Sequence, residues 1–184
     1  MTPTNKDLEN HLSKGSLILS LLAEKLNTAN YLLAQLASDN TPAVLSNHFF
    51  IFTTHIYFRS AMIDLCALLA DNKKTHKNNF HRIYQDPNLA QSLPPAAVAQ
   101  VKQLLEEGKQ DIDEIITLRD TAFAHYDFIQ PNLSFDTEKI PVANKLFTLS
   151  QEILSLCGQE IGIGYIIGFD YFQSLQQLVG RQSV

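Results

Sequence analysis

The sequence predicts an all-α protein, folded as an up-and-down four-helix bundle with extra short helices. Along four long stretches, leucine and other apolar residues recur at three- and four-residue steps, which is the period of an amphipathic helix. No stretch shows the apolar and polar alternation of a convincing strand. Because each amphipathic helix must bury its apolar face against another, the four stretches are expected to pack together as a bundle.

The bulk composition fits one folded domain. The chain has 184 residues, of which 45% are hydrophobic and 18% are charged, values that are ordinary for a globular protein. This length is enough for one well-buried core and rather short for two. We expect a single domain over residues 1–184, with an N-terminal helix in 1–37, the core helices in 42–126 and C-terminal helices in 140–180.

Charge and targeting features restrict the classes of partner. The formal net charge of −5 disfavours non-specific electrostatic binding of nucleic acid. Any RNA contact would therefore need a local basic patch. The N-terminus lacks the charged-then-apolar order of a secretory signal, and no apolar run reaches the roughly 20 residues that span a bilayer. Cys66 and Cys157 lie in apolar surroundings and are expected to be buried thiols. We expect a cytoplasmic protein without a membrane partner.

The first two helices are predicted over about 4–37 and 42–69. The sequence SDNTP separates them, because Asp, Asn and Pro favour turns. The second helix is unusually apolar, so its few polar side chains lie near packed surface and need partners. Among these, Asp64 is a candidate partner for Arg59 or for Arg119, and it is counted as a supporting residue of the site described below.

A markedly basic segment spans residues 70–87. Cationic and aromatic side chains are interleaved there, as on surfaces that bind single-stranded nucleic acid. The structural alternative is a charged loop with one short helix from Asn79 to Tyr84. Its histidines have no carboxylate or cysteine at ligand spacing, so no metal and no other cofactor is expected. The candidate RNA-binding residues are Lys73, Lys74, Lys77 and Arg82.

A third long helix is predicted from about Ser92, a possible cap, to about Ala124. Gly108 weakens it in the middle by about 1 kcal/mol relative to alanine. Residues 129–139 are predicted to form a loop on composition. A fourth helix is predicted over 141–157, since Pro suits a first helical turn.

Glycines mark the end of the fourth helix and the segment after it. Gly158 is predicted to cap the helix. Gly162, Gly164 and Gly168 do not have the spacing of a dinucleotide-binding loop, and no strand precedes them. Close helix packing through Gly164 and Gly168, within the bundle or between subunits, is expected instead.

Arg119 stands out within residues 112–127, which read IDEIITLRDTAFAHYD. On a helix, this arginine falls in the middle of an apolar stripe of isoleucines and aromatic residues. Burying an unpaired charge costs several kcal/mol or more, so the guanidinium of Arg119 must have a binding partner. The candidates are a carboxylate, a second subunit and an anionic ligand.

His125 follows six residues later and lies roughly 120° around the helix from Arg119. The two side chains cannot touch along one straight helix. They can converge on a shared anion if the helix ends or bends near Ala124, or if a two-fold dimer brings in a second copy. The dipole at the helix C-terminus favours a cation and therefore a protonated His125.

This pair of residue types suits RNA cleavage. Attack by the 2′-hydroxyl of RNA needs a proton acceptor, a proton donor for the leaving 5′-oxygen, and positive charge for the developing phosphorane. Histidine can be acid or base near neutral pH, and an arginine fork can hold two phosphate oxygens, so no metal is required. In the structural alternative, Arg119 pairs with Asp64 or Asp120, and His125 is only a helix-end histidine.

The motif LRDTAFAHYD resembles the signature of HEPN domains, an all-helical superfamily marked by an Arg and a His about four to six residues apart. Its polar members are Arg119, Asp120, His125 and Asp127. It is most similar to the abortive-infection, AbiU-like branch, in which such a motif ends a long helix. The sequences FRSAMIDLCALLADNKK and FHRIYQD also resemble that branch, so the resemblance covers residues 53–127 in two pieces.

The resemblance implies a HEPN-like bundle that forms a homodimer, with Arg119 and His125 of both protomers lining a cleft. Active HEPN members are metal-independent endoribonucleases. By position, Arg119 and His125 would be the catalytic pair, Asp120 would help to orient them, and Asp127 would be a supporting residue. Tyr126 departs from related motifs, which often carry an arginine there.

The predicted function is a metal-independent endoribonuclease that cuts single-stranded RNA by 2′-hydroxyl attack at a dimer cleft. Its setting would be phage defence or a toxin-antitoxin system, with an antitoxin or a nucleotidyltransferase as a possible partner. The alternative is a non-catalytic HEPN module that binds a nucleotide, an RNA or a protein partner.

Overall fold

The computed structural model describes residues 6–36, 48–71, 77–120 and 133–167. Within these ranges the chain forms seven helices and no strand, so the predicted all-α class is confirmed. The helices are α1 (Lys6–Leu36), α2 (His48–Leu69), α3 (Arg82–Gln85), α4 (Pro87–Ala90), α5 (Pro95–Glu107), α6 (Lys109–Leu118) and α7 (Leu133–Glu160).

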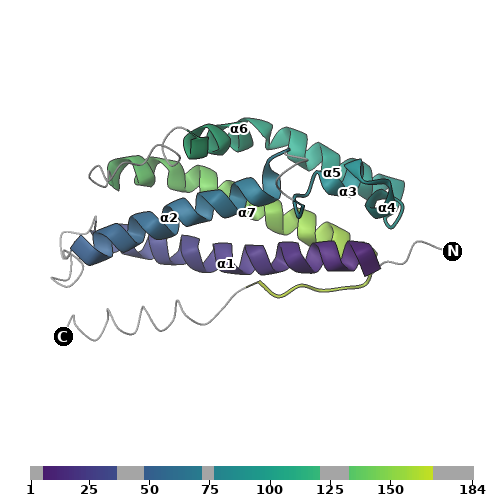
Figure 1. Ribbon diagram of the computed structural model, residues 1–184, viewed down its shortest axis with the longest axis horizontal. Coiled ribbons are helices and arrows are strands. Elements are labelled where there is room, and N and C mark those ends of the chain that lie inside the picture. Colours follow the sequence, from purple (N-terminus) through teal and green to yellow (C-terminus); the bar gives the residue numbers. More distant parts are fainter. Residues whose placement is uncertain (1–5, 37–47, 72–76, 121–132, 168–184) are drawn as a thin grey trace.

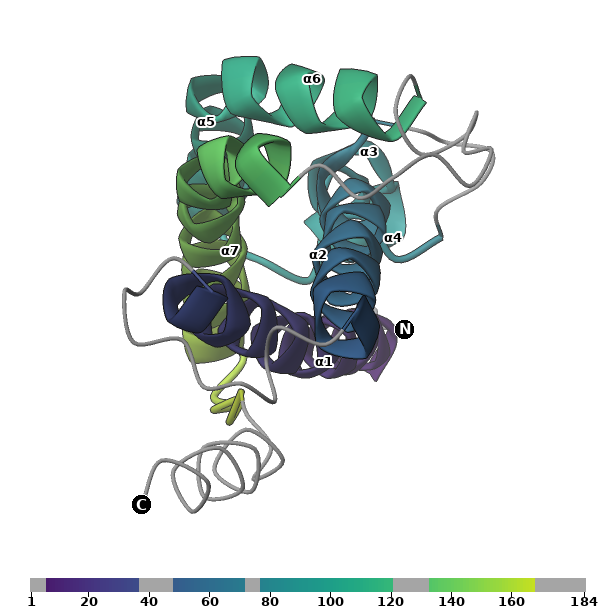
Figure 2. The ribbon, with the colours of Figure 1, turned by 90° about the vertical axis from the view of Figure 1, so that its left-hand side faces the viewer.

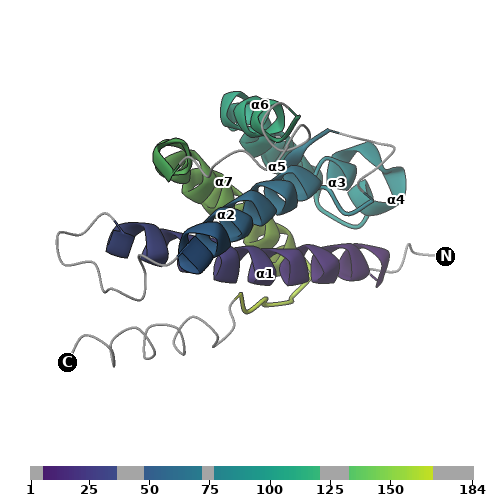
Figure 3. The ribbon, with the colours of Figure 1, turned by 60° about the vertical axis from the view of Figure 1, so that its left-hand side comes forward.

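Four helical rods run alternately up and down the bundle (Figure 1). α1 and α2 are antiparallel neighbours, α5 and α6 follow one another as one broken rod, and α7 returns in the opposite direction. Seen end-on, α1 lies below, α2 and α7 at the sides, and α5 with α6 above (Figure 2). The short helices α3 and α4 lie beyond the C-terminal end of α2 and near the N-terminal end of α1 (Figure 3).

The core is built from the apolar faces that the sequence pattern predicts. The α2 side chains Phe58, Met62, Leu65 and Leu69 recur at three- and four-residue steps and are fully buried. Removing such a side chain from water contributes about 1.5–3 kcal/mol, so truncating one to alanine costs about 2–5 kcal/mol. The leucines of α1 that the pattern places on its apolar side are also buried, namely Leu8, Leu12, Leu19, Leu22, Leu26 and Leu33.

α2 carries a second apolar stripe that faces away from the core. It consists of Phe49, Phe52, Ile56 and Ile63, and we call it the outer stripe of α2. Steps of three, four and seven residues place these side chains on one side of the helix, and 44–66% of each is exposed. The helix is therefore apolar on two sides, which explains its unusually apolar sequence.

Gly15 and Phe80 anchor the segment between α2 and α3 on α1. The Phe80 side chain is fully buried, and its backbone N–H donates to the carbonyl of Leu68 at 2.8 Å. A β-carbon at Gly15 would lie only 3.3 Å from Cε1 of Phe80, so the glycine leaves room for the aromatic ring. The short helix predicted over Asn79–Tyr84 is found as α3, slightly later in the chain, and is followed by α4.

The predicted third helix is two helices. Gly108 separates α5 from α6 and has a backbone conformation of φ −81°, ψ −3°. A β-carbon there would lie 2.6 Å from Cδ2 of Leu149, so the break is also a point of close approach to α7. The predicted cap Ser92 is wrong: α5 begins behind Pro94, and the Ser92 hydroxyl donates to the carbonyl of Asn88 at 3.0 Å.

α7 begins eight residues before the predicted start at Pro141, so the loop predicted over 129–139 is wrong from Leu133 onward. Pro141 lies inside the helix, where it removes one backbone hydrogen bond. Tertiary contacts hold the neighbouring turn: Ile140 packs against the core, and Nζ of Lys139 donates to Glu114 of α6 at 2.7 Å. The preference of proline for the first turn of a helix therefore predicted the wrong start for α7.

Gly162, not Gly158, terminates α7. Gly162 has φ +74°, and its N–H donates to the carbonyl of Gln159 at 3.1 Å while the N–H of Ile163 donates to the carbonyl of Gly158 at 2.8 Å. These two bonds form the Schellman motif of a glycine-capped helix end. Gly158 is needed for another reason, because a β-carbon there would lie 2.6 Å from the oxygen of Ile163.

The residues that follow the cap are not helical up to position 167. The C-terminal helices predicted over 140–180 therefore end at Glu160 within the described part of the chain. Close packing through Gly164 within the bundle is not found, because a β-carbon there would meet nothing within 4 Å, and packing between subunits stays a prediction. Gly168 lies outside the described residues. Among the described helices, none has the length and apolar character to cross a membrane.

Candidate functional site

Arg119 directly follows α6 and keeps helical backbone angles of φ −58° and ψ −47°. Its side chain is 26% exposed, and Nε donates to Oδ1 of Asp120 at 2.8 Å. This hydrogen bond favours the charged guanidinium and raises the pKa of Arg119. Within the described part of the chain, Nη1 and Nη2 of Arg119 make no hydrogen bond. The described residues therefore leave the terminal nitrogens of the arginine fork open to another partner.

The packing of α6 on α2 sets the position of Arg119. Ile112, Ile115 and Leu118 are buried, and Sγ of Cys66 on α2 donates to the carbonyl of Ile115 at 3.7 Å. Arg119 lies one helical turn beyond Ile115 and is close enough to Cys66 to influence its ionisation. Burial raises the pKa of Cys66 to about 11 in spite of the arginine charge. The thiol is therefore neutral and is no counter-ion for Arg119.

Among the described residues, Asp64 pairs with a lysine of α1 and not with Arg119. Its carboxylate binds Nζ of Lys25 on α1 at 2.5 Å, and both side chains are 22% exposed. Asp64 and Cys66 are two residues apart, hence about 200° apart around α2, so Asp64 faces α1 while Cys66 faces α6. Of the two carboxylates considered for Arg119, the structure brings only Asp120 to it.

His125 and Asp127 lie outside the described residues, and so do Lys73 and Lys74. The convergence of Arg119 and His125 therefore stays a prediction.

Arg82 is engaged within its own segment. Its Nη2 pairs with Oδ2 of Asp86 at 2.5 Å, and its Nη1 donates to the carbonyl of Lys77 at 2.9 Å. The guanidinium thus joins Lys77, in the middle of the basic segment, to Asp86, the residue that precedes α4. Lys77 is exposed at the surface. The predicted basic patch is therefore weaker than its sequence indicates, because a carboxylate neutralises one of its four cations.

The structure adds two residues of α1, His11 and Lys14, which the sequence analysis missed. They line a pocket of about 370 Å³ together with Lys77 and Arg82, and we call it the α1 pocket. His11 is only 6% exposed. Burial, with the positive charges of Arg82 and Lys14, lowers the pKa of His11 to about 4, so the imidazole is neutral. No sequence pattern marks these residues, because their neighbours come from a segment about 70 positions away.

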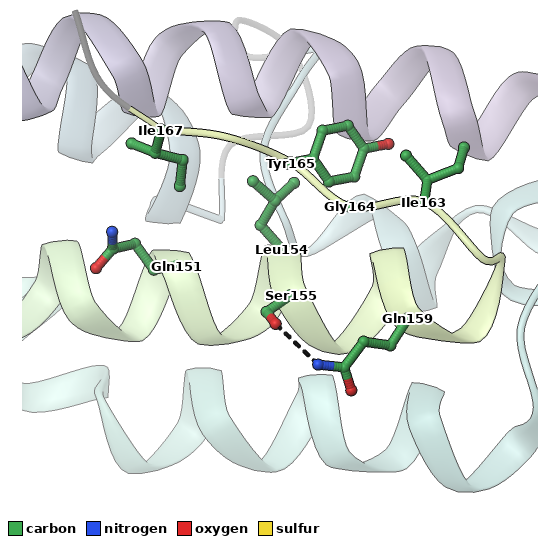
Figure 4. Close-up of a pocket in the computed structure, with 8 residues that line it drawn as sticks. All are labelled: Gln151, Leu154, Ser155, Gln159, Ile163, Gly164, Tyr165 and Ile167. Carbon is green, nitrogen blue, oxygen red and sulfur yellow. Dashed lines mark hydrogen bonds between the residues drawn. The ribbon is translucent and has the colours of Figure 1, made fainter.

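Another pocket, of about 380 Å³, lies between α7 and residues 161–167 (Figure 4). Gln159 and Ser155 line it from α7, where the Gln159 amide donates to the Ser155 hydroxyl at 3.2 Å, and Tyr165 lines it from the other side. None of its lining residues is Asp, Glu, Lys, Arg or His. It offers hydrogen bonds and apolar surface but no charge or acid–base group, so it does not suit phosphate chemistry.

No group of three or more His, Cys, Asp or Glu side chains that could hold a metal ion is found among the described residues. The two cysteines are both fully buried and free, as their sequence surroundings predict.

A comparison with protein families gives a match to this chain. A family model described as HEPN AbiU2 matches residues 10–162, a range that includes His11, the Arg119 motif and the cap of α7. No curated protein and no solved structure matches the chain significantly. The match spans most of the sequence, and the all-α fold agrees with it. The chain therefore belongs to the HEPN AbiU2 family.

Proposed function

We propose that the chain is a metal-independent endoribonuclease of HEPN type, which cuts single-stranded RNA by 2′-hydroxyl attack at a dimer cleft. The observation that carries this proposal is the state of Arg119. A carboxylate holds its Nε, while Nη1 and Nη2 make no hydrogen bond within the described residues. Such a fork can bind two oxygens of a phosphate.

Asp120 supports an orienting role in this site. Its bond to Nε restricts the rotation of the Arg119 side chain without covering the terminal nitrogens. An arginine held in this way loses less side-chain entropy when it binds phosphate than a freely moving one. Since Asp64 is bound to Lys25, the described residues bring no second carboxylate that would compete with phosphate for the fork.

The outer stripe of α2 supports a homodimer. Its members, such as Phe49 and Ile63, are large apolar side chains, each 44–66% exposed in one protomer. Ile63 and Cys66 are three residues apart, hence about 60° apart around α2, and Cys66 contacts α6. A second copy seated on the stripe would therefore adjoin the end of α6. Two copies of His125 at such an interface would supply one proton acceptor and one proton donor.

We place this activity in phage defence or a toxin-antitoxin system, in line with the family to which the chain belongs. Uncontrolled RNA cleavage would harm the cell, which would require an antitoxin or a modifying nucleotidyltransferase as a partner. Arrest of cell growth on expression, relieved by Arg119→Ala, is the result that this setting requires.

The test is cleavage of labelled single-stranded RNA by the full-length protein in excess EDTA. We expect products that end in a 2′,3′-cyclic phosphate, because the attacking oxygen is the 2′-hydroxyl. Arg119→Ala and His125→Ala should each reduce the rate by a factor of about 10² or more. Lys102→Ala, which removes an exposed cation on α5, is the matched control and should leave the rate unchanged. Cleavage that persists in both site variants would contradict the proposal.

A second candidate is a non-catalytic HEPN module that binds a nucleotide, an RNA or a protein partner. The α1 pocket favours it, because this pocket offers polar and cationic groups away from the Arg119 motif. RNA that stays intact but binds in an Arg119-dependent manner would support this candidate over the nuclease.

A further inference from the structure

α1 carries two exposed leucines that belong neither to the core nor to the outer stripe of α2. Leu17 is 57% exposed and Leu21 is 45% exposed, while Leu19 and Leu22 beside them are fully buried. The two exposed side chains are four residues apart, so they are neighbours on the surface of the helix. We call Leu17 and Leu21 the α1 patch. Covering these side chains would remove apolar surface from water, which is favourable.

The segment after the cap of α7 lies along the same helix. Residues 161–167 run beside α1 and toward its C-terminal end (Figures 1 and 4). The hydroxyl of Tyr165 is close enough to Glu9 and Ser13 of α1 to be influenced by them. Tyr165 and Ile167 both pack against the core, whereas Ile166 between them is 92% exposed. The segment is therefore held on α1 and still leaves one large apolar side chain in water.

The register of this segment brings its end to the α1 patch. Ile167 follows Tyr165 by two residues, which in a non-helical chain span at most about 7 Å. Leu17 follows Ser13 by four residues, or about 6 Å along α1, and lies about 40° around the helix from it. Because Tyr165 lies at Ser13, Ile167 comes level with Leu17. The described part of the chain therefore ends beside the patch.

The sequence that follows Ile167 has an apolar side of its own. Residues 168–184 lie outside the described residues, and they also lie beyond the range 10–162 that the family model matches. Within them, apolar residues recur at steps of three, three and four, while most of the polar residues fall on the opposite side of a helix. This pattern predicts an amphipathic helix over about 169–179. Its apolar side consists of Phe169, Phe172, Leu175 and Val179.

Such a helix needs an apolar partner. A helix of about 11 residues is marginal in water by itself, so its stability must come from packing of its apolar side. Only Gly168 separates the predicted helix from Ile167. A link this short gives the helix a high effective concentration at any surface beside Ile167. The α1 patch is an exposed apolar surface at that place.

We propose that the α1 patch is the docking site of residues 169–179 of the same chain. These residues form an amphipathic helix, and its apolar side covers Leu17, Leu21 and Ile166. The contact adds a further layer to the bundle outside α1. The proposal does not depend on ribonuclease activity or on the dimer.

The test is limited proteolysis of the full-length protein with chymotrypsin, with the products identified by mass spectrometry. Cleavage within 169–179 should be at least tenfold slower than in a synthetic peptide of residues 168–184, because protease reaches only the undocked form. Leu17→Glu and Leu21→Glu should each raise the rate in the protein by about tenfold. Cleavage within α7 in the same digests should not change, which shows that the bundle stays folded.

A matched control distinguishes docking in the same chain from docking on a second copy. Ile56→Glu also replaces an exposed apolar residue, but on α2 and in the proposed dimer interface. Slow cleavage of 169–179 in this variant assigns the helix to its own chain. Fast cleavage in Ile56→Glu, as in the α1 variants, would assign the helix to the second copy and overturn the proposal.

Methyl NMR gives a readout at the patch itself. The methyl signals of Leu17 and Leu21 should shift in Leu175→Glu, which changes the apolar side of the predicted helix. They should keep their positions in Gln177→Glu, which changes its polar side. Signals that are unchanged in Leu175→Glu, or cleavage as fast in the wild type as in the free peptide, would overturn the proposal.

Discussion

Asp120 holds Arg119 through Nε, across a distance of 2.8 Å, and the two residues are neighbours in the chain. A carboxylate that bound Nη1 and Nη2 would close the guanidinium to any ligand. A carboxylate at Nε fixes the plane of the group and leaves its outer edge for an anion. The ion pair with Asp120 therefore compensates the charge of Arg119, and it also fixes the direction in which the guanidinium points.

Removing this carboxylate should affect activity more than stability. The pair is exposed, 26% on Arg119 and 60% on Asp120, so Asp120→Ala should change the free energy of unfolding by less than about 1 kcal/mol. The rate of RNA cleavage should fall by about tenfold, because the guanidinium loses its orientation. Asp113→Ala, which removes an exposed carboxylate on α6, is the control. Equal rates of RNA cleavage by Asp120→Ala and the wild type would show that Asp120 does not orient Arg119 for catalysis.

Charging the outer stripe of α2 should produce monomers. Ile56→Glu places a carboxylate in the middle of the proposed interface, where its burial is unfavourable. Light scattering coupled to gel filtration should then give half the wild-type mass. Leu17→Glu, at an exposed apolar position of α1, should remain dimeric. A monomeric wild type at high concentration would exclude the dimer cleft.

Both thiols should resist labelling until the protein unfolds. Burial raises the pKa of Cys66 to about 11 and that of Cys157 to about 12, so neither forms the reactive thiolate at pH 8. Unfolded cysteines ionise near 9.0, so the stability gained from neutral thiols is full below that pH and is lost as pH rises toward 11–12. A disulfide-exchange reagent should find two thiols in denaturant and almost none without it.

Three alanine substitutions should separate the roles of the glycines at the end of α7. Gly158→Ala meets the backbone oxygen of Ile163 and should cost about 2 kcal/mol or more. Gly162→Ala forces a φ of +74° on a residue with a side chain and should cost about 1–2 kcal/mol. Gly164→Ala enters open space and should stay within about 0.5 kcal/mol of wild type. The midpoints of urea unfolding measure the stability of all three variants. Equal effects of the three substitutions would argue against a glycine cap at the end of α7.

Acid should destabilise the fold through His11. Its pKa is lowered from 6.5 to about 4 by burial and by the charges of Arg82 and Lys14. The resulting stability is full above pH 6.5 and is lost as the pH falls through 4, by up to about 3 kcal/mol. Unfolding at pH 7 and pH 4.5 should show a steeper loss in wild type than in His11→Gln. Equal losses would mean that other groups control the acid transition.

The buried faces of the long helices could be predicted from sequence, and the ends of those helices could not. Leu22 and Leu26 follow a period that belongs to the helix itself, so the sequence alone reveals it. The start of α7 depends on contacts of Lys139 and Ile140 with distant residues, which overrode the ordinary preference of Pro141 for a first turn. Local rules fail where tertiary contacts decide.

The same division holds for the site. Arg119 could be singled out because a charge interrupts an apolar stripe, and that signal lies within one helix. The pairing of Asp64 with Lys25 could not be predicted, since it depends on which side of α2 meets α1. His11 was missed for the same reason, because only the packing of Phe80 brings its neighbours to it.

The contact between Phe80 and Gly15 has a consequence for the wall of the α1 pocket that carries Lys77. Because a core side chain fixes this wall, the wall is in place in the free protein. A molecule that bound in the pocket would therefore spend little of its interaction energy on ordering the chain. Its association would proceed in a single fast phase, with a rate proportional to its concentration and without a conformational lag.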